Sequence, residues 1–215
     1  MNKNTFTKKE IALMHRLNTP AKVQDFLNKI PINFEYDGED RVKSPMLVLR
    51  ENTAHCIEGA ILGAYILSLH GYEPLLMNFK VAKGDFEHVT VPFKINGYWG
   101  ALSKTNHAVL RYREPVYKTI RELAMSYFHE YLWYKHKGRK TLRQYTAPLN
   151  LRRFKGYETS TEDLWNIDAA LDKCKHYDCA PKKNLQHMRL ADPIEIEAGD
   201  LTEWKPDKKK LKKRQ

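Results

Sequence analysis

An almost wholly apolar stretch at residues 56–69 constrains the fold of this chain more than any other feature. Its length and composition predict a buried helix, and the His-Gly pair at 70–71 ends it, since glycine favours the backbone of a helix C-terminus. Asn52 or Thr53, just before it, can cap the first turn. Cys56 then lies at the positive end of the helix dipole, which lowers a thiol's pKa and favours the nucleophilic thiolate.

A β-hairpin is expected after this helix. Alternating apolar residues predict strands at 74–81, 86–95 and 98–104, and Asn96-Gly97 predicts a two-residue turn between the last two. In that register His88 lies opposite Thr105, and Ser103 is its diagonal neighbour on the same face of the sheet. The other face is apolar core. His88 is therefore on the less apolar side, where a nucleophilic thiol could meet an imidazole base.

These segments resemble the transglutaminase-like superfamily, which has a papain-like fold. The resemblance covers about residues 25–130 and rests on Asn-Thr-Ala-His-Cys-Ile-Glu-Gly-Ala at 52–60, Glu-His-Val-Thr-Val at 87–91 and Gly-Tyr-Trp-Gly-Ala-Leu-Ser at 97–103. It implies that Cys56 is the nucleophile and His88 its base. Ser103 stands where the family has an orienting Asp, and a serine hydroxyl makes only a neutral hydrogen bond. Asn106 is the alternative orienting group, as in Cys-His-Asn enzymes.

The resemblance implies thiol-dependent acyl transfer, with hydrolysis of a peptide or isopeptide amide in a protein or peptide substrate as the first expectation. Cys56 would attack the carbonyl, His88 would move the proton, Ser103 would orient His88, and the Cys56 backbone N–H would bind the oxyanion. Neither a cofactor nor a metal is expected. The superfamily also has catalytically silent members, so a binding module for a protein or nucleic-acid partner is the alternative. The serine at 103 favours that alternative, whereas the retained Cys and His favour the enzyme.

The expected fold class is α+β, with the buried Cys-bearing helix packed on a small antiparallel sheet and extra C-terminal helices. We expect one transglutaminase-like domain at residues 1–204, with a core at about 25–130, an elaboration at 131–204 and a disordered basic tail at 205–215. The remaining patterns predict helices at 4–18, 21–30, 115–137 and 159–175, strands at 32–36 and 193–197, and irregular chain at 139–158.

The charge of the chain is concentrated at its C-terminal end. Of the net charge of +11, the tail at 205–215 carries seven Lys and Arg residues against one Asp. Such a run predicts at most weak, non-specific nucleic-acid contact, because it carries no sequence readout. No apolar run approaches the roughly 20 residues that span a bilayer, so no membrane partner is expected. Three cysteines without an export signal predict reduced thiols and a cytoplasmic location.

Three further groups have simpler structural interpretations. Metal-capable side chains cluster at 174–179, but their Cys-x4-Cys spacing matches no common zinc signature, which favours incidental thiols at a helix end. Basic residues at 111–113 and 135–143 are interleaved with tyrosines that could stack bases, but snorkelling residues on an amphipathic helix face are the more common origin of such a pattern. His55 is expected to point away from Cys56 and not to act as the base.

Overall fold

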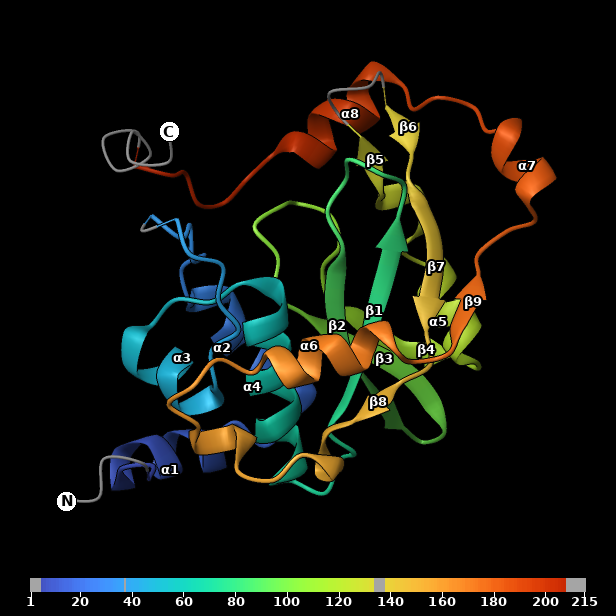
Figure 1. The fold of residues 1–215 in the computed structure, drawn as a ribbon. Helices are drawn as coiled ribbons and strands as arrows, with labels where there is room; N and C mark the ends of the chain where they lie inside the picture. Colours follow the sequence, from blue (N-terminus) through green and yellow to red (C-terminus); the bar gives the residue numbers. More distant parts are fainter. Residues whose placement is uncertain (1–4, 37, 134–137, 208–215) are drawn as a thin grey trace.

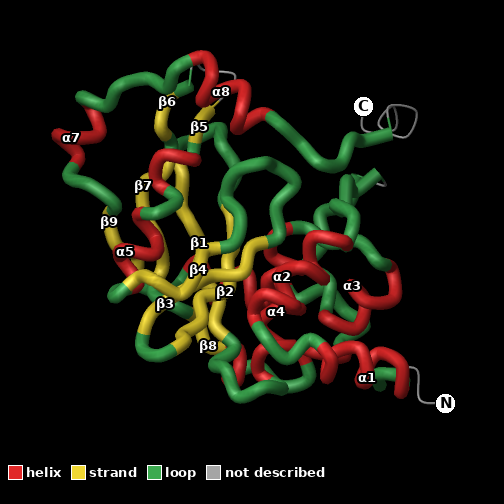
Figure 2. The backbone as a smooth tube through the Cα atoms, turned by 180° about the vertical axis from the view of Figure 1, so that it is seen from behind, coloured by secondary structure: helices red, strands yellow, loops and turns green. Residues whose placement is uncertain are grey.

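The computed structural model describes residues 5–36, 38–133 and 138–207 (Figure 1). Helices from the first third of the chain gather on one side of the molecule, and an antiparallel sheet forms the other side (Figures 1 and 2). The chain thus has the α+β architecture expected from its sequence. The helical side consists of α1 (Lys8–Arg16), α2 (Pro20–Lys29), α3 (Pro45–Glu51) and α4 (Cys56–Ser68).

The main sheet has the strand order β4-β3-β2-β1-β7-β9, with β8 pairing to the start of β1. All of these pairings are antiparallel. The strands are β1 (Leu75–Val81), β2 (His88–Ile95), β3 (Tyr98–Ser103), β4 (Arg113–Tyr117), β7 (Leu142–Thr146), β8 (Leu149–Asn150) and β9 (His176–Asp178). Two short strands, β5 (Leu132–Trp133) and β6 (Arg139–Lys140), form a separate ribbon.

The hairpin of β2 and β3 has the predicted register. Ile95 pairs with Tyr98, and Thr90 pairs with Ser103. Both turn residues have positive φ, 51° at Asn96 and 85° at Gly97, as a type I′ turn requires. The turn therefore sets which residues of the two strands face one another, including those near His88.

Helix α4 is buried along nearly its whole length, as its apolar composition predicts, and it packs against β2. Its Gly59 allows a close approach to the end of β3, because a Cβ there would lie 2.5 Å from Cβ of Lys104. The other face of the sheet is covered by a second core around Phe79, Tyr127 and Tyr131. Both faces of the sheet are therefore closed, and the start of α4 lies beside the first residues of β2.

The predicted long helix at 115–137 is wrong. Pro115 lies in β4, at the edge of the sheet, where a missing N–H is tolerated. The chain then forms only α5 (Ile120–Met125), a 3-10 turn at Phe128–Glu130 and β5. The aromatic residues of this region gave it a helical pattern, but they pack onto Phe79 instead. Residues 134–137 lie outside the described part of the chain.

Other expected elements also differ. No strand forms at 32–36, where Ile32 makes an isolated bridge with Ala54. The supposedly irregular stretch at 139–158 contains β7, which pairs with β1. The expected strand at 193–197 is α8 (Pro193–Asp200), since Asp192 caps it and proline suits a first helical turn.

Helix α6 (Trp165–Asp172) is shorter than predicted and begins after Leu164 instead of at the polar run before it. Helix α3, which no pattern above predicted, follows a capping Ser44 and begins with Pro45. A short helix, α7 (Lys182–Gln186), and 3-10 turns at Leu151–Arg153 and Tyr157–Thr159 complete the described elements.

The segment after α8 returns to the helical side of the molecule (Figures 1 and 2). Thr202 forms a bridge with His107, and the backbone N–H of Asp207 donates to Tyr36 Oη at 2.7 Å. Residues 208–215, most of the expected basic tail, lie outside the described chain, and the single domain at 1–204 stays a prediction. None of the helices in the described ranges is long and apolar enough to cross a membrane.

Candidate active site

Cys56 is the first residue of α4, and the start of this helix is held by a buried carboxylate. His55 is the N-cap residue, and its backbone N–H donates to Glu58 Oε2 at 2.7 Å. The caps expected from the sequence are wrong, since Asn52, with φ 51°, ends helix α3 instead. Cys56 nevertheless occupies the first helical turn, as predicted, where backbone N–H groups have no partner within the helix.

Glu58 belongs to a buried polar network with Lys43. The backbone N–H of Lys43 donates to Glu58 Oε1 at 3.1 Å, and the Lys43 ammonium donates to the carbonyl of Thr53 at 2.9 Å and to its hydroxyl at 2.8 Å. Glu51 accepts a further hydrogen bond from the ammonium at 3.1 Å. This network links α3, the 52–55 turn and α4, so it fixes the backbone that carries Cys56.

The surroundings of the Cys56 thiol favour its neutral form. Burial raises the pKa of the thiol above its ordinary value of 9.0, and hydrogen bonds from the backbone of Val89 and Ile57 offset this only in part. The expected lowering of the pKa by the helix dipole is therefore wrong, because the cost of removing a charge from water is larger. The contact with the backbone of Val89 places the sulfur next to the residue that follows His88 in β2.

His88 begins β2 and is buried, with 6% of its surface exposed. Burial lowers its pKa to about 4, with the nearby His107 acting in the same direction. Its Nε2 lies 2.7 Å from Oγ of Ser103, so the structure brings these two predicted site residues together. Together with the raised pKa of Cys56, this describes a neutral thiol at the start of α4 and a neutral imidazole at the start of β2.

The hydrogen bonds of Ser103 determine which nitrogen of His88 carries the proton. The Ser103 hydroxyl donates its single hydrogen to the backbone carbonyl of Leu110. Oγ can then only accept from His88, so Nε2 is protonated and Nδ1 carries a free lone pair. A base that takes a proton from a thiol needs such a lone pair.

Leu110 has an unusual backbone conformation for a bulky residue. Its φ is +59°, which is rare outside glycine and asparagine. Its N–H donates to Glu130 Oε2 at 2.6 Å, and Glu130 is in turn paired with Arg113. These contacts hold the Leu110 carbonyl against the Ser103 hydroxyl. The positive φ of Leu110 costs free energy, and backbone strain of this kind is typical of functional sites.

Asn106 does not replace Ser103 as the partner of His88. Its amide nitrogen donates to the carbonyl of Trp204 at 2.9 Å, and its amide oxygen accepts from the Trp204 N–H at 2.7 Å. Both functional atoms of the side chain are therefore used to bind the C-terminal segment. Glu87 binds Asn78 and Lys80, as expected for a residue on the other side of its strand.

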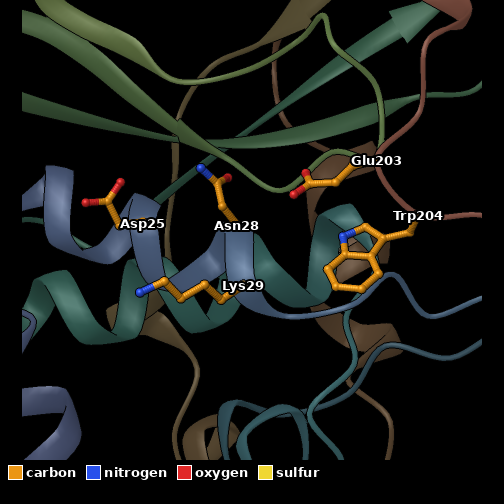
Figure 3. A pocket seen from close by; sticks show the side chains of 5 residues that line it. All are labelled: Asp25, Asn28, Lys29, Glu203 and Trp204. Carbon is orange, nitrogen blue, oxygen red and sulfur yellow. The ribbon is translucent and has the colours of Figure 1, made fainter.

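A cavity of about 320 Å³ opens beside His88. Its walls include the carboxylates of Asp85, Glu87 and Glu130. Apolar groups complete it, and among them Phe86 is 87% exposed. A larger and more open hollow of about 500 Å³ lies elsewhere, between α2 and the C-terminal segment, lined by Asp25, Asn28, Lys29, Glu203 and Trp204 (Figure 3). No imidazole of the described residues lines this hollow, whereas His88 lines the first cavity, so the cavity at His88 is the candidate substrate site.

The part of the chain that carries this site is similar to a known family. Residues 46–146 match the family model for Vasohibin. The match runs from α3 to the end of β7 and includes Cys56, His88 and Ser103. Similarity to Vasohibin supports the transglutaminase-like resemblance of the sequence and a cysteine-type enzyme fold. Among curated proteins, none matches the chain.

One residue of the site lies outside the Vasohibin match and was missed in the sequence. The side chain of Gln24, on α2, accepts from the N–H of Ser103 at 2.9 Å and donates to its carbonyl at 2.8 Å. The signal was a polar amide on the buried face of α2, between Val23 and Leu27. A buried amide needs partners, but the sequence does not say where they are.

The other candidate groups have structural roles. Within the described residues no cluster of three or more His, Cys, Asp or Glu could hold a metal ion. Cys174 donates to the carbonyl of Ala170 at 3.3 Å, while Cys179 is buried. His55 Nε2 lies 2.8 Å from Glu35. Arg113 stacks over Tyr127 and pairs with Glu130, so it belongs to the second core.

Proposed function

We propose that this chain is a thiol-dependent acyl-transfer enzyme that hydrolyses a peptide or isopeptide amide. One observation carries the proposal: the hydrogen-bonded series from His88 to Ser103 to Leu110, which leaves the lone pair on Nδ1 of His88, the first residue of the strand against which α4 packs. A purely structural buried histidine would have both ring nitrogens hydrogen-bonded. A base needs a fixed tautomer with the other nitrogen free.

The proposed reaction starts from the neutral pair. As the Cys56 sulfur forms a bond to the substrate carbonyl carbon, its proton moves to His88 Nδ1. The tetrahedral intermediate then expels the amine, which takes that proton from Nδ1, and a thioester remains on Cys56. Water, activated by the same nitrogen, cleaves the thioester. The backbone N–H of Cys56, in the first turn of α4, is one donor to the oxyanion.

The neutral orienting group has a kinetic consequence in this proposal. Ser103 offers His88 no negative charge, so the imidazolium that forms during attack is less stabilised than it would be beside an Asp. Because burial already lowers the pKa of His88 to about 4, the proton must pass quickly to the leaving amine. We expect an enzyme that depends on precise substrate placement more than on a reactive resting thiol.

The substrate in this proposal is a protein or peptide, and the reaction requires neither cofactor nor metal. The mostly apolar walls of the cavity at His88 suit a peptide side chain. All three cysteines, Cys56, Cys174 and Cys179, are free. A reduced nucleophile suits a reducing compartment such as the cytoplasm, which is the proposed location.

The proposal is tested with a Cys174→Ser/Cys179→Ser background that leaves Cys56 as the only thiol. This protein is treated with p-nitrophenyl acetate, and acetylation of Cys56 is followed by mass spectrometry of the intact chain. We expect acetylation that falls by about 10²-fold or more in His88→Ala, the usual contribution of a general base. A peptide library then identifies cleaved sequences, with Cys56→Ser as the control. A Cys56 that alkylates but never accepts an acyl group would favour the catalytically silent binding module.

A further inference from the structure

The cavity at His88 contains a tyrosine whose hydroxyl is unused in the resting structure. Tyr131 lines this cavity and is only 2% exposed. Among the described residues, its buried Oη has no hydrogen-bond partner. The neighbouring buried Tyr127 differs, because its hydroxyl donates to the carbonyl of Arg111 at 3.1 Å. Buried tyrosine hydroxyls normally find a partner, so the exception at Tyr131 calls for a functional reason.

Tyr131 is held in place through both its ring and its backbone. Its ring packs at 5.7 Å from that of Phe79, and its backbone carbonyl accepts from the N–H of Thr141 at 3.0 Å. Burial raises the pKa of Tyr131 well above its ordinary value, and the negative charge that Cys56 carries when deprotonated acts in the same direction. The hydroxyl is therefore a fixed, protonated donor in the cavity that His88 lines.

The proposed reaction needs such a donor. The backbone N–H of Cys56 supplies one hydrogen bond to the oxyanion, and a tetrahedral intermediate is usually bound by two. Another donor in the cavity, His107, is engaged through Nδ1 with the carbonyl of Gly199 at 2.9 Å. Tyr131 Oη combines an uncommitted hydrogen with a position in the cavity that His88 also lines.

We propose that Tyr131 Oη is the second donor of the oxyanion hole. It would donate to the carbonyl oxygen as negative charge develops there during attack by Cys56, together with the Cys56 N–H. This inference rests on the proposed acyl-transfer function, and it assigns a catalytic role to a residue that neither the motif spacing nor the Vasohibin match singles out.

Two reagents separate this role from an effect on the nucleophile. With p-nitrophenyl acetate, an S–C bond forms at the carbonyl, the thiol proton goes to His88 and p-nitrophenolate leaves, through a tetrahedral oxyanion. Iodoacetamide alkylates the same sulfur at a saturated carbon and expels iodide, so no oxyanion forms. A lost oxyanion donor should slow the first reaction and leave the second unchanged.

The test compares Tyr131→Phe with the matched control Tyr127→Phe, each with Cys56 as the only thiol. We expect Tyr131→Phe to slow acetylation by about 10²–10³-fold, the usual effect of losing one oxyanion donor, and to change alkylation by less than about twofold. Tyr127→Phe should leave both rates unchanged, since its ring stays and its hydroxyl lies outside the cavity. Thermal denaturation checks that both variants are folded.

Each other outcome overturns the inference in a different way. Equal acetylation of the parent and Tyr131→Phe would remove Tyr131 from the oxyanion hole while leaving the proposed function intact. Equal loss of acetylation and alkylation would mean that Tyr131 acts on the thiol or on the fold. A parent protein that is alkylated but not acetylated would overturn the acyl-transfer function and this inference together.

Discussion

The side-chain amide of Gln24 spans the backbone of Ser103, accepting from its N–H at 2.9 Å and donating to its carbonyl at 2.8 Å. The backbone of a neighbouring strand would make the same two hydrogen bonds, but here a side chain on a helix makes them. It joins α2 to the last residue of β3 at the point where Ser103 meets His88. The orientation of the imidazole is thus set by a contact between the two halves of the fold.

Replacing Gln24 tests this coupling. Gln24→Ala leaves a buried N–H and a buried carbonyl unpaired, so we expect the free energy of unfolding to fall by about 1–3 kcal/mol in urea titrations. Cys56 acetylation should slow as Ser103 loses its fixed position. The control is Asn28→Ala, which removes only the outer partner of Gln24. A full loss of stability with an unchanged acetylation rate would mean that the contact is purely structural.

Ser103→Ala removes the acceptor of His88 Nε2 and the donor to Leu110. We expect acetylation of Cys56 to slow about tenfold, equivalent to ~1.4 kcal/mol, the size of one neutral hydrogen bond. Ser103→Thr keeps the hydroxyl and should retain most of the rate. If alanine and threonine reacted equally fast, the hydroxyl would have no role in orienting His88.

The low pKa of His88 predicts how stability changes with pH. In the unfolded chain a histidine titrates near ~6.5, whereas burial lowers the pKa of His88 in the folded protein to about 4. The unfolded state therefore binds the extra proton first, so stability is full above pH ~6.5 and falls as the pH drops toward about 4. The loss attributable to His88 can reach about 3 kcal/mol.

Chemical denaturation of the parent and of His88→Gln at pH 7.5 and pH 5 measures this effect. Other titrating groups act in both proteins, so the difference between the two pH dependences isolates His88. We expect the parent to lose more stability at pH 5 than the variant does. Identical losses would show that His88 is not buried in its neutral form.

Glu58→Gln tests the network beneath Cys56. The carboxylate accepts from two backbone N–H groups, those of Lys43 and His55, and an amide can place only one oxygen there. We expect the free energy of unfolding to fall by about 1–3 kcal/mol. Glu51→Gln is the control, because that carboxylate is more exposed and its ion pairs contribute about 0–1 kcal/mol. Equal effects in the two variants would contradict a buried role for Glu58.

The parts of the site that could be predicted from the sequence rest on local signals. The Asn96-Gly97 turn determines the hairpin register within a few residues, and the apolar run at 56–69 identifies a buried helix without reference to the rest of the chain. Together they brought His88 and Ser103 onto one face, where they form a hydrogen bond. That interaction follows from strand periodicity alone.

The missed features depend on contacts between distant segments. Gln24 and Leu110 both bind Ser103, from 79 and 7 residues away along the chain. The pKa of Cys56 is raised by burial, which results from the packing of the whole fold. The lowered pKa expected from the sequence was based on the helix dipole, which depends only on the local helix. The helix predicted at 115–137 failed for a related reason, since its aromatic residues serve the core around Phe79 and not one face of a helix.

The pairing of β7 with β1 has a consequence for how the chain is made. Synthesis proceeds from the N-terminus, so β1 leaves the ribosome well before residues 142–146. At about 5–20 residues per second, the interval is roughly 3–12 s. During this interval the backbone groups of Leu75–Val81 that later pair with β7 have no partner strand, and the strand includes the apolar residues Met77 and Phe79. Such an unpaired edge can bind a strand from another chain. Nascent chains of this protein should therefore aggregate most readily when translation stalls between β1 and β7.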